Sequence, residues 1–379
     1  MNRLTGIFGI IAILGIAYLL SNDKKNINLR VVAWGLGLQL LFGIFILITP
    51  FGKPIFSWFD KLINKLLGFS YDGSEFLFSS FIDGKMHPAV INFAFAVLPT
   101  VIFFSALMAV LYHLGIMQKI IKIVALIMQK TMKTSGPETT SISANIFVGQ
   151  TEAPLVIRPF ISKMTNSELM AVMTGGFATV AGGVMAIYVG MLANIPGIAG
   201  HLMAASIMSA PAALVIAKIM YPEKNKTNMN EHIDLNTISD EGNVLEALGN
   251  GATDGLKLAA NIAAMLIAFV ALISLTNYIL SIFSTSLEDI LGYVFMPLAY
   301  LMGAPWEESQ ILGSLLGQKI VLTELIAYIN LSNMAVGVDI SEKTAILASY
   351  ALCGFSNFAS IGIQLGGIGS IAPERKKDL

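Results

Sequence analysis

Three consecutive polar residues, Gln150, Thr151 and Glu152, interrupt an apolar region of the chain and carry groups suited to binding a polar solute. Their amide, hydroxyl and carboxylate supply both donors and acceptors of hydrogen bonds. A carboxylate at membrane depth costs about 2.5 kcal/mol or more unless something faces it, so intramembrane acids mark substrate or ion paths. Glu324, which stands between short apolar arms, is a second such acid. The structural alternatives are a soluble loop for Glu152 and an ion pair with Lys319 for Glu324.

These acids need elements that bend back inside a membrane. Gly149 and Pro154 flank the first polar triplet and disfavour a continuous helix. Non-helical backbone survives at membrane depth only where it is buried in protein or lines a cavity. We therefore predict a re-entrant hairpin over Ser143–Pro159 and a second over Pro305–Asn330, whose apolar arms are each about half a span. A broken helix with a polar tip is typical of a transporter binding site.

The composition indicates a polytopic membrane protein. Of 379 residues, 55% are hydrophobic and 12% are charged, whereas soluble domains carry about 25% charged residues. The net charge of -1 and the lack of a basic patch argue against a nucleic-acid partner. The single cysteine, Cys353, cannot form an internal disulfide. The sequence contains no histidine set with metal-ligand spacing, no nucleophile–base pair and no phosphate-binding loop, so we do not expect an enzyme.

The fold class predicted from these patterns is all-α, with about seven transmembrane helices, two re-entrant hairpins and interfacial helices. The predicted spans are Leu4–Leu20, Arg30–Thr49, Ala89–Tyr112, Glu168–Asn194, Gly197–Tyr221, Leu256–Leu280 and Thr344–Leu365. The predicted interfacial helices are Pro54–Leu67, Glu75–Met86, His113–Ser135 and Leu287–Leu301. Paired glycines in the fourth span and Ser356-Asn357 in the seventh favour a break in each, so each hairpin is followed by an interrupted span, as in an inverted repeat.

Lysines and arginines gather after the first, third and fifth spans and in the C-terminal tail. Because short cytoplasmic loops carry an excess of these residues, we expect the N-terminus outside and the C-terminal end of the chain inside. The stretch Leu4–Leu20 lacks a small-residue cleavage site and is followed by charged residues, so we predict an anchor rather than a signal peptide.

Several stretches resemble the concentrative nucleoside transporter family. They are GQTEAPLVIRPF at Gly149–Phe160, SELMAVMTGGFATVAGGV at Ser167–Val184, GYVFMPLAYLMGAPW at Gly292–Trp306 and CGFSNFASIGIQLGGIGSIAPER at Cys353–Arg375. The resemblance implies a homotrimer in the lipid bilayer of the plasma (inner) membrane that imports a uridine-like nucleoside by cotransport with sodium. No other cofactor is implied.

The resemblance also implies a division of each protomer into a scaffold and a moving transport domain. Residues 1–113 would form the first scaffold helices, and residues 114–221 the first half of the transport domain. Residues 222–285 would form a cytoplasmic loop and span six of the scaffold, and residues 286–379 the second half of the transport domain. Family members continue past the Pro-Glu-Arg segment into a final helix, which this sequence, ending at Leu379, is expected to lack.

Site residues follow from the same resemblance. Contacts with the nucleobase are implied for Gln150, Thr151, Glu152 and Val184. Contacts with the ribose hydroxyls are implied for Glu324, Asn357 and Ser360, with Phe355 beside them. The sodium ligands would be the side chains of Asn145 and Thr179 and the carbonyls of Val148 and Val180.

Three other functions are open at this point. The first is a proton-coupled version of the same carrier, in which Glu152 or Glu324 titrates. The second is an intramembrane enzyme that uses the two carboxylates as acid and base, which would chemically change its substrate. The third is an ion channel, which predicts large ion currents and no saturable substrate.

Overall fold

The computed structural model describes residues 2–47, 49, 54–65, 67, 98–224 and 242–379. Within these residues the chain is helical and forms no β-strand, which confirms the all-α class. The predicted surface helix Glu75–Met86, the first part of the predicted third span and most of the loop Pro222–Asn243 lie outside the described residues.

By length and composition, three helices in the described part of the chain are suited to cross a membrane, or up to five if each of two bent helix pairs is one span. Seven spans were predicted. The number is lower because several apolar helices are short, such as Thr5–Leu19 and Phe358–Ile371. A spanning helix needs about 20 apolar residues, with a range of about 17–25, and these helices are shorter than that.

The first two helices, α1 (Asn2–Leu19) and α2 (Leu29–Leu47), match the first two predicted spans. Residues 54–65 are helical, as the predicted interfacial helix requires. The next pair bends by 77° between α5 (Leu98–His113) and α6 (Ile116–Met132). Four lysines of the predicted interfacial helix His113–Ser135 are exposed here: Lys119, Lys122, Lys130 and Lys133. The structure therefore agrees with an amphipathic helix at this point.

The first hairpin descends through α7 (Gly136–Asn145) and is non-helical over residues 146–152. It returns through two short helices, α8 (Ala153–Val156) and α9 (Arg158–Ile161), each with a proline in its first turn. Span four follows as two half-helices, α10 (Asn166–Ala178) and α11 (Gly182–Met191), and α12 (Ile198–Met220) is span five. The predicted hairpin tip and the predicted break in span four are both confirmed.

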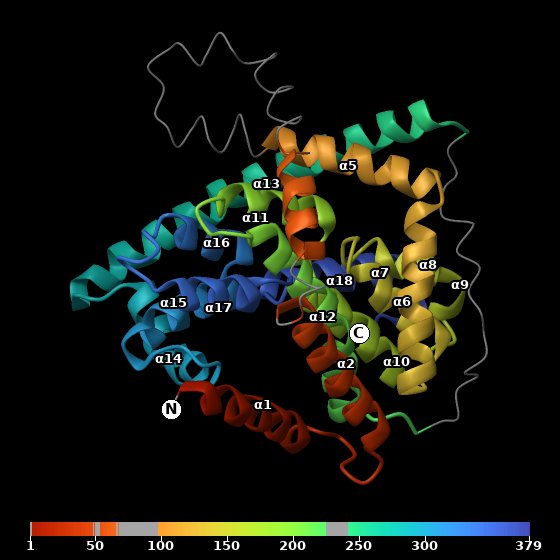
Figure 1. Cartoon of the computed structure of the whole chain (residues 1–379), viewed down its shortest axis with the longest axis horizontal. Helices are drawn as coiled ribbons and strands as arrows, with labels where there is room; N and C mark the ends of the chain where they lie inside the picture. Colours follow the sequence, from red (N-terminus) through yellow and green to blue (C-terminus); the bar gives the residue numbers. More distant parts are fainter. Residues whose placement is uncertain (1, 48, 50–53, 66, 68–97, 225–241) are drawn as a thin grey trace.

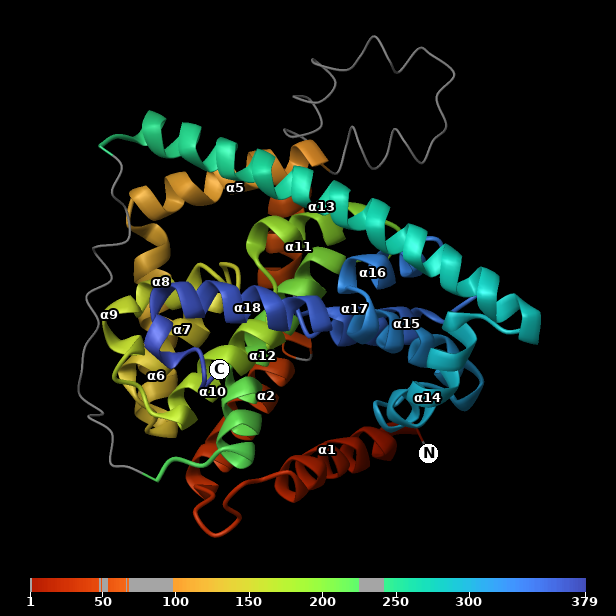
Figure 2. The same ribbon diagram turned by 180° about the vertical axis from the view of Figure 1, so that it is seen from behind.

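Helix α13 (Val244–Leu280) begins well before the predicted start of span six at Leu256. Its 37 residues span about 55 Å at 1.5 Å per residue, so the helix is strongly tilted or extends beyond a hydrocarbon layer of about 30 Å. Two glycines four residues apart, Gly251 and Gly255, lie against the backbone of α5 near Ala106 and Ile102. This close helix–helix contact stabilises the glycine-rich part of α13, because glycine by itself lowers the stability of a helix. Figure 2 shows α13 running along α5.

The second hairpin is preceded by α14 (Leu287–Leu301), which was predicted as interfacial and packs along the first arm of the hairpin. That arm is α15 (Ser309–Val321), and the chain returns through α16 (Glu324–Ser332). Span seven is broken into α17 (Glu342–Leu352) and α18 (Phe358–Ile371), as predicted. Figure 1 shows α14–α17 and α6–α9 on opposite sides of the molecule, with α12 and α18 between them.

The two broken spans meet at Gly354, which lies in the break of span seven. Its φ of +116° is a backbone conformation that favours glycine. A Cβ at this position would lie 2.8 Å from the carbonyl oxygens of Phe177 and Ala178, at the end of α10. The rings of Tyr188 and Tyr328 stack nearby in the largest buried apolar cluster, with their centroids 4.2 Å apart. The two broken spans therefore meet at their breaks.

Candidate functional site

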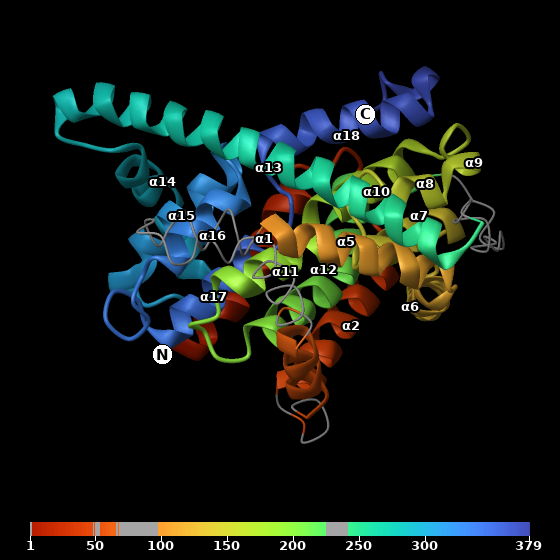
Figure 3. The ribbon, with the colours of Figure 1, turned by 90° about the horizontal axis from the view of Figure 1, so that it is seen from above.

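A cavity of about 210 Å³ lies where the two hairpin tips approach the two broken spans. Helix α13 closes part of it with Leu258 and Ile262. Figure 3 shows α13 and α18 along the same edge of the molecule. All the substrate residues implied by the sequence line this one cavity: Gln150, Thr151, Glu152, Val184, Glu324, Phe355, Asn357 and Ser360. Glu152 and Glu324 thus share one cavity, although they come from different repeats.

Helix N-termini converge on the cavity. Ala181 precedes α11, Glu324 opens α16 and Asn357 precedes α18. The Asn357 side chain caps its helix, since its Oδ1 accepts a hydrogen bond of 2.8 Å from the backbone N–H of Ser360. Because a helix N-terminus carries a partial positive charge, these ends favour carboxylates and electron-rich ligand atoms in the cavity.

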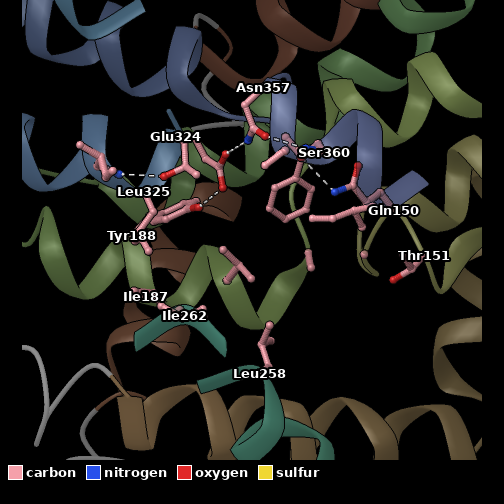
Figure 4. A pocket seen from close by; sticks show the side chains of 18 of the residues that line it. Gln150, Thr151, Ile187, Tyr188, Leu258, Ile262, Glu324, Leu325, Asn357 and Ser360 are labelled. Carbon is pink, nitrogen blue, oxygen red and sulfur yellow. Dashed lines mark hydrogen bonds between the residues drawn. The ribbon is translucent and has the colours of Figure 1, made fainter. Parts of the chain in front are cut away.

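Glu324 is nearly buried, with 6% of its surface exposed. One carboxylate oxygen accepts a hydrogen bond of 2.9 Å from the Tyr188 hydroxyl, and the other accepts one of 2.7 Å from Asn357 Nδ2 (Figure 4). An ionised carboxylate has about four acceptor positions, so Glu324 retains capacity for a ligand. The predicted alternative of an ion pair with Lys319 is wrong: Lys319 Nζ lies within 4.0 Å of no described carboxylate and donates to backbone carbonyls instead.

Gln150 joins the first hairpin to span seven. Its Nε2 donates a hydrogen bond of 3.1 Å to Ser360 Oγ, and its Oε1 accepts one of 3.0 Å from Gln364 Nε2. Gln364 also donates to the carbonyl of Met173 at 3.1 Å. The sequence analysis missed Gln364. Its place one helical turn after Ser360, on the same face of a broken span, is the signal that points to it.

The two remaining residues of the hairpin tip each pack against a glycine. A Cβ at Gly149 would lie 2.1 Å from Glu152 Oε2, so the carboxylate turns back over Gly149 and would have to move to admit a larger residue there. The Thr151 methyl faces Gly367 of α18. Tyr188, which also contacts the cavity, was missed by the sequence analysis because an apolar helix gives no local sign of a partner in the other repeat.

The implied sodium ligands lie at the C-terminal ends of two half-helices. Asn145 is the last residue of α7 and is 1% exposed, and neither of its amide atoms has a hydrogen-bond partner. Thr179 follows α10 and donates from Oγ1 to the carbonyl of Gly175 at 3.0 Å. Val148 and Val180 lie in the adjoining breaks, which the 2.9 Å hydrogen bond from Gly182 N–H to the Phe147 carbonyl ties together.

Such a donor set fits a small hard cation. Oxygen ligands and helix C-termini suit sodium, and an orphaned buried amide loses free energy unless a ligand satisfies it. Among the described residues, no group of three or more His, Cys, Asp or Glu side chains could hold a metal ion.

Comparisons with known proteins agree with this geometry. Residues 8–81 and 201–379 match models of the N-terminus and the C-terminus of the Na+ dependent nucleoside transporter family, and residues 94–195 match a model described as nucleoside recognition. The uncharacterized transporter YutK of Bacillus subtilis is 44% identical over 390 residues, which is 100% of this chain and 94% of that protein.

Two further relatives carry functional descriptions. Sodium/nucleoside cotransporter 1 of Mus musculus is 42% identical over 399 residues, covering 100% of this chain and 60% of that protein. The structure of CNTnw in an inward-facing substrate-bound state superposes with a TM-score of 0.91 at 42% identity, covering 100% of this chain and 92% of that one. The chain belongs to the concentrative nucleoside transporter family. The family is one of Na+ dependent nucleoside transporters, which are membrane proteins and not enzymes.

Proposed function

We propose that this family member imports a uridine-like nucleoside by cotransport with sodium. The observation that carries the proposal is the shared cavity, in which polar groups of both repeats face one another across apolar walls. Gln150, Thr151 and Glu152 contact the nucleobase, beside Val184. The ribose hydroxyls contact Glu324 and two residues of the second broken span, Asn357 and Ser360. Phe355 lies beside them.

Ribose recognition rests on acceptors that are already in place. Tyr188 and Asn357 orient the Glu324 carboxylate, whose remaining acceptor positions pair with sugar hydroxyls. A deoxy analogue leaves such buried acceptors unpaired, at a cost of about 1–3 kcal/mol per group. This chemistry favours a ribonucleoside over its deoxy counterpart.

Coupling rests on the first hairpin. Sodium binds the side chains of Asn145 and Thr179 and the carbonyls of Val148 and Val180. The orphaned amide of Asn145 supports this assignment, since the ion would satisfy its oxygen. Because Asn145 ends the arm that leads into the tip, sodium orders Gln150 and Thr151 before the nucleoside binds. A ligand shifts an equilibrium only by its differential affinity, so sodium must favour the ordered tip.

The transport domain consists of residues 114–221 and 286–379, and it moves against a scaffold formed by residues 1–113 and 222–285 of a homotrimer. CNTnw has been solved in inward-facing and outward-facing states, which supports alternating access here. The protein lies in the plasma (inner) membrane with its N-terminus outside and residue 379 inside. The lysine-rich, exposed face of α6 supports this orientation.

Uptake of labelled uridine into proteoliposomes, with and without an inward sodium gradient, tests the proposal. We expect saturable uptake that needs sodium and delivers unchanged uridine. Uptake that follows a proton gradient without sodium would replace the sodium mechanism with the proton-coupled alternative. Large ion currents without saturable uptake would indicate a channel.

A pair of variants on one hairpin tests the ribose site. Glu324→Gln removes the charge that accepts the hydroxyls, so we expect weaker uridine binding and a smaller preference over 2′-deoxyuridine. Glu307→Gln is the matched control, because Glu307 is exposed and does not line the cavity. Normal transport by Glu324→Gln would refute the assigned role.

A further inference from the structure

Lys319 is a buried lysine for which the proposed function has no use. It lies near the end of α15 and is 6% exposed. Its Nζ donates hydrogen bonds to the carbonyl of Ala351 at 2.9 Å and to the carbonyl of Cys353 at 3.5 Å. Within the described residues no carboxylate lies within 4.0 Å of it, so its direct partners are backbone carbonyls.

The two carbonyls belong to the C-terminal end of α17, where span seven breaks. The last four carbonyls of a helix have no partner within the helix, and they carry its partial negative charge. The second hairpin supplies donors to this end from both arms, because the Tyr328 hydroxyl of α16 also donates to the carbonyl of Ser349, at 2.8 Å. Lys319 is the charged donor of the pair.

The first hairpin also packs against the break of its own span, but it carries an asparagine there in place of a lysine. There α7 packs against α10, the Gly182 N–H after the break of span four donates to the Phe147 carbonyl, and the hairpin contributes Asn145 at the end of α7. The Asn145 amide is buried without any hydrogen-bond partner, whereas Lys319 is satisfied by carbonyls. One hairpin thus carries a buried amide without a hydrogen-bond partner beside its broken span, and the other carries an ammonium group bonded to carbonyls at the break of its own span.

We propose that Lys319 is a tethered cation that does for the second hairpin what the coupling ion does for the first. This inference rests on the proposed function of the first site. The ammonium group holds the second hairpin against the broken span permanently. Glu324, which follows at the start of α16, is therefore oriented before the nucleoside arrives. Lys319 is a positioning residue, and nucleoside binding requires an added cation at one repeat only.

The test is chemical rescue of the full-length protein by methylammonium. Lys319→Ala leaves a space the size of the lysine side chain beside two unpaired carbonyls. We expect millimolar methylammonium to raise the midpoint of thermal unfolding of this variant in the absence of nucleoside. Lys319→Met fills the space with an apolar chain and is expected to show no such rise. Lys343→Ala is the matched control, because Lys343 also donates to a carbonyl, that of Gly303, but is exposed.

A second readout is uridine affinity by calorimetry at saturating sodium. We expect Lys319→Ala to bind uridine about tenfold more weakly or worse, as the loss of a charge-assisted hydrogen bond predicts, and methylammonium to restore the affinity. Methylammonium that acts equally on Lys319→Ala and Lys319→Met, or on neither, would overturn the proposal.

A third variant covers the case in which Lys319→Ala does not fold. Lys319→Gln keeps a neutral donor and is expected to fold but to bind uridine weakly. Affinity equal to that of the unaltered protein would show that the charge is unnecessary. The thermal experiment needs no nucleoside, so a failure of the unaltered protein to bind uridine would count against the proposed function alone.

Discussion

Removal of the Gln364 side-chain amide should weaken nucleoside binding without any direct contact to the nucleoside. The carbonyl of Met173 can only accept, so the Gln364 atom 3.1 Å from it is the amide nitrogen. The same nitrogen lies 3.0 Å from Gln150, which must therefore present its oxygen there and its own nitrogen to Ser360. A backbone carbonyl thus fixes which edge of Gln150 faces the cavity.

The magnitude follows from what Gln364→Met removes. The hydrogen bond to Gln150 is worth about 0.5–1.5 kcal/mol net. A glutamine side chain that must be ordered on binding costs up to about 1.5–2 kcal/mol. Since Gln150 keeps its bond to Ser360, only part of that ordering is lost. We expect a loss of about 1–2 kcal/mol, which is about 5- to 30-fold in Kd.

Calorimetric titration of uridine in sodium measures this loss. Ser370→Ala is the matched control on α18, because its exposed hydroxyl donates only to the carbonyl of Gly367. Gln364→Glu should be worse than Gln364→Met, since a carboxylate cannot donate to either acceptor. If folded Gln364→Met binds uridine as tightly as the unaltered protein, then Gln150 is oriented by other contacts and the reasoning is refuted.

Three other outcomes follow from the packing. Lys218→Met leaves Glu138 buried without its 2.7 Å ion-pair partner, so chemical denaturation in detergent should show a loss of about 3–5 kcal/mol, and Glu138→Gln in the same chain should recover part of it. No loss would mean that the pair is compensated elsewhere. Gly354→Ala places a Cβ 2.8 Å from the Ala178 carbonyl at a positive φ, which should lower the thermal midpoint and the uridine affinity together. Asn145→Leu should abolish the sodium dependence of uridine binding, and unchanged dependence on sodium in a titration would place the ion elsewhere.

Local patterns in the sequence decided much of the architecture. Apolar stretches predicted the second and fifth spans and the helix at the first because a helix in lipid must satisfy its own backbone. Gly149, Pro154 and the polar triplet predicted the first hairpin tip, since a helix cannot continue through them at low cost. The family motifs predicted the residues that line the cavity, and their individual roles in binding remain predictions.

Contacts across the repeats were decided only by the tertiary structure. The sequence analysis offered Lys319 as a partner for Glu324 because the two are neighbours in the chain, whereas the folded hairpin directs Lys319 to the end of α17 and gives Glu324 to Tyr188. The hydrogen bond from Gln150 to Ser360 joins positions 210 residues apart. Helical period and residue type report on neighbours within one or two turns, and they hold no information on which distant side chain will meet a buried polar group. That choice is made when the packed repeats leave each such group one available partner.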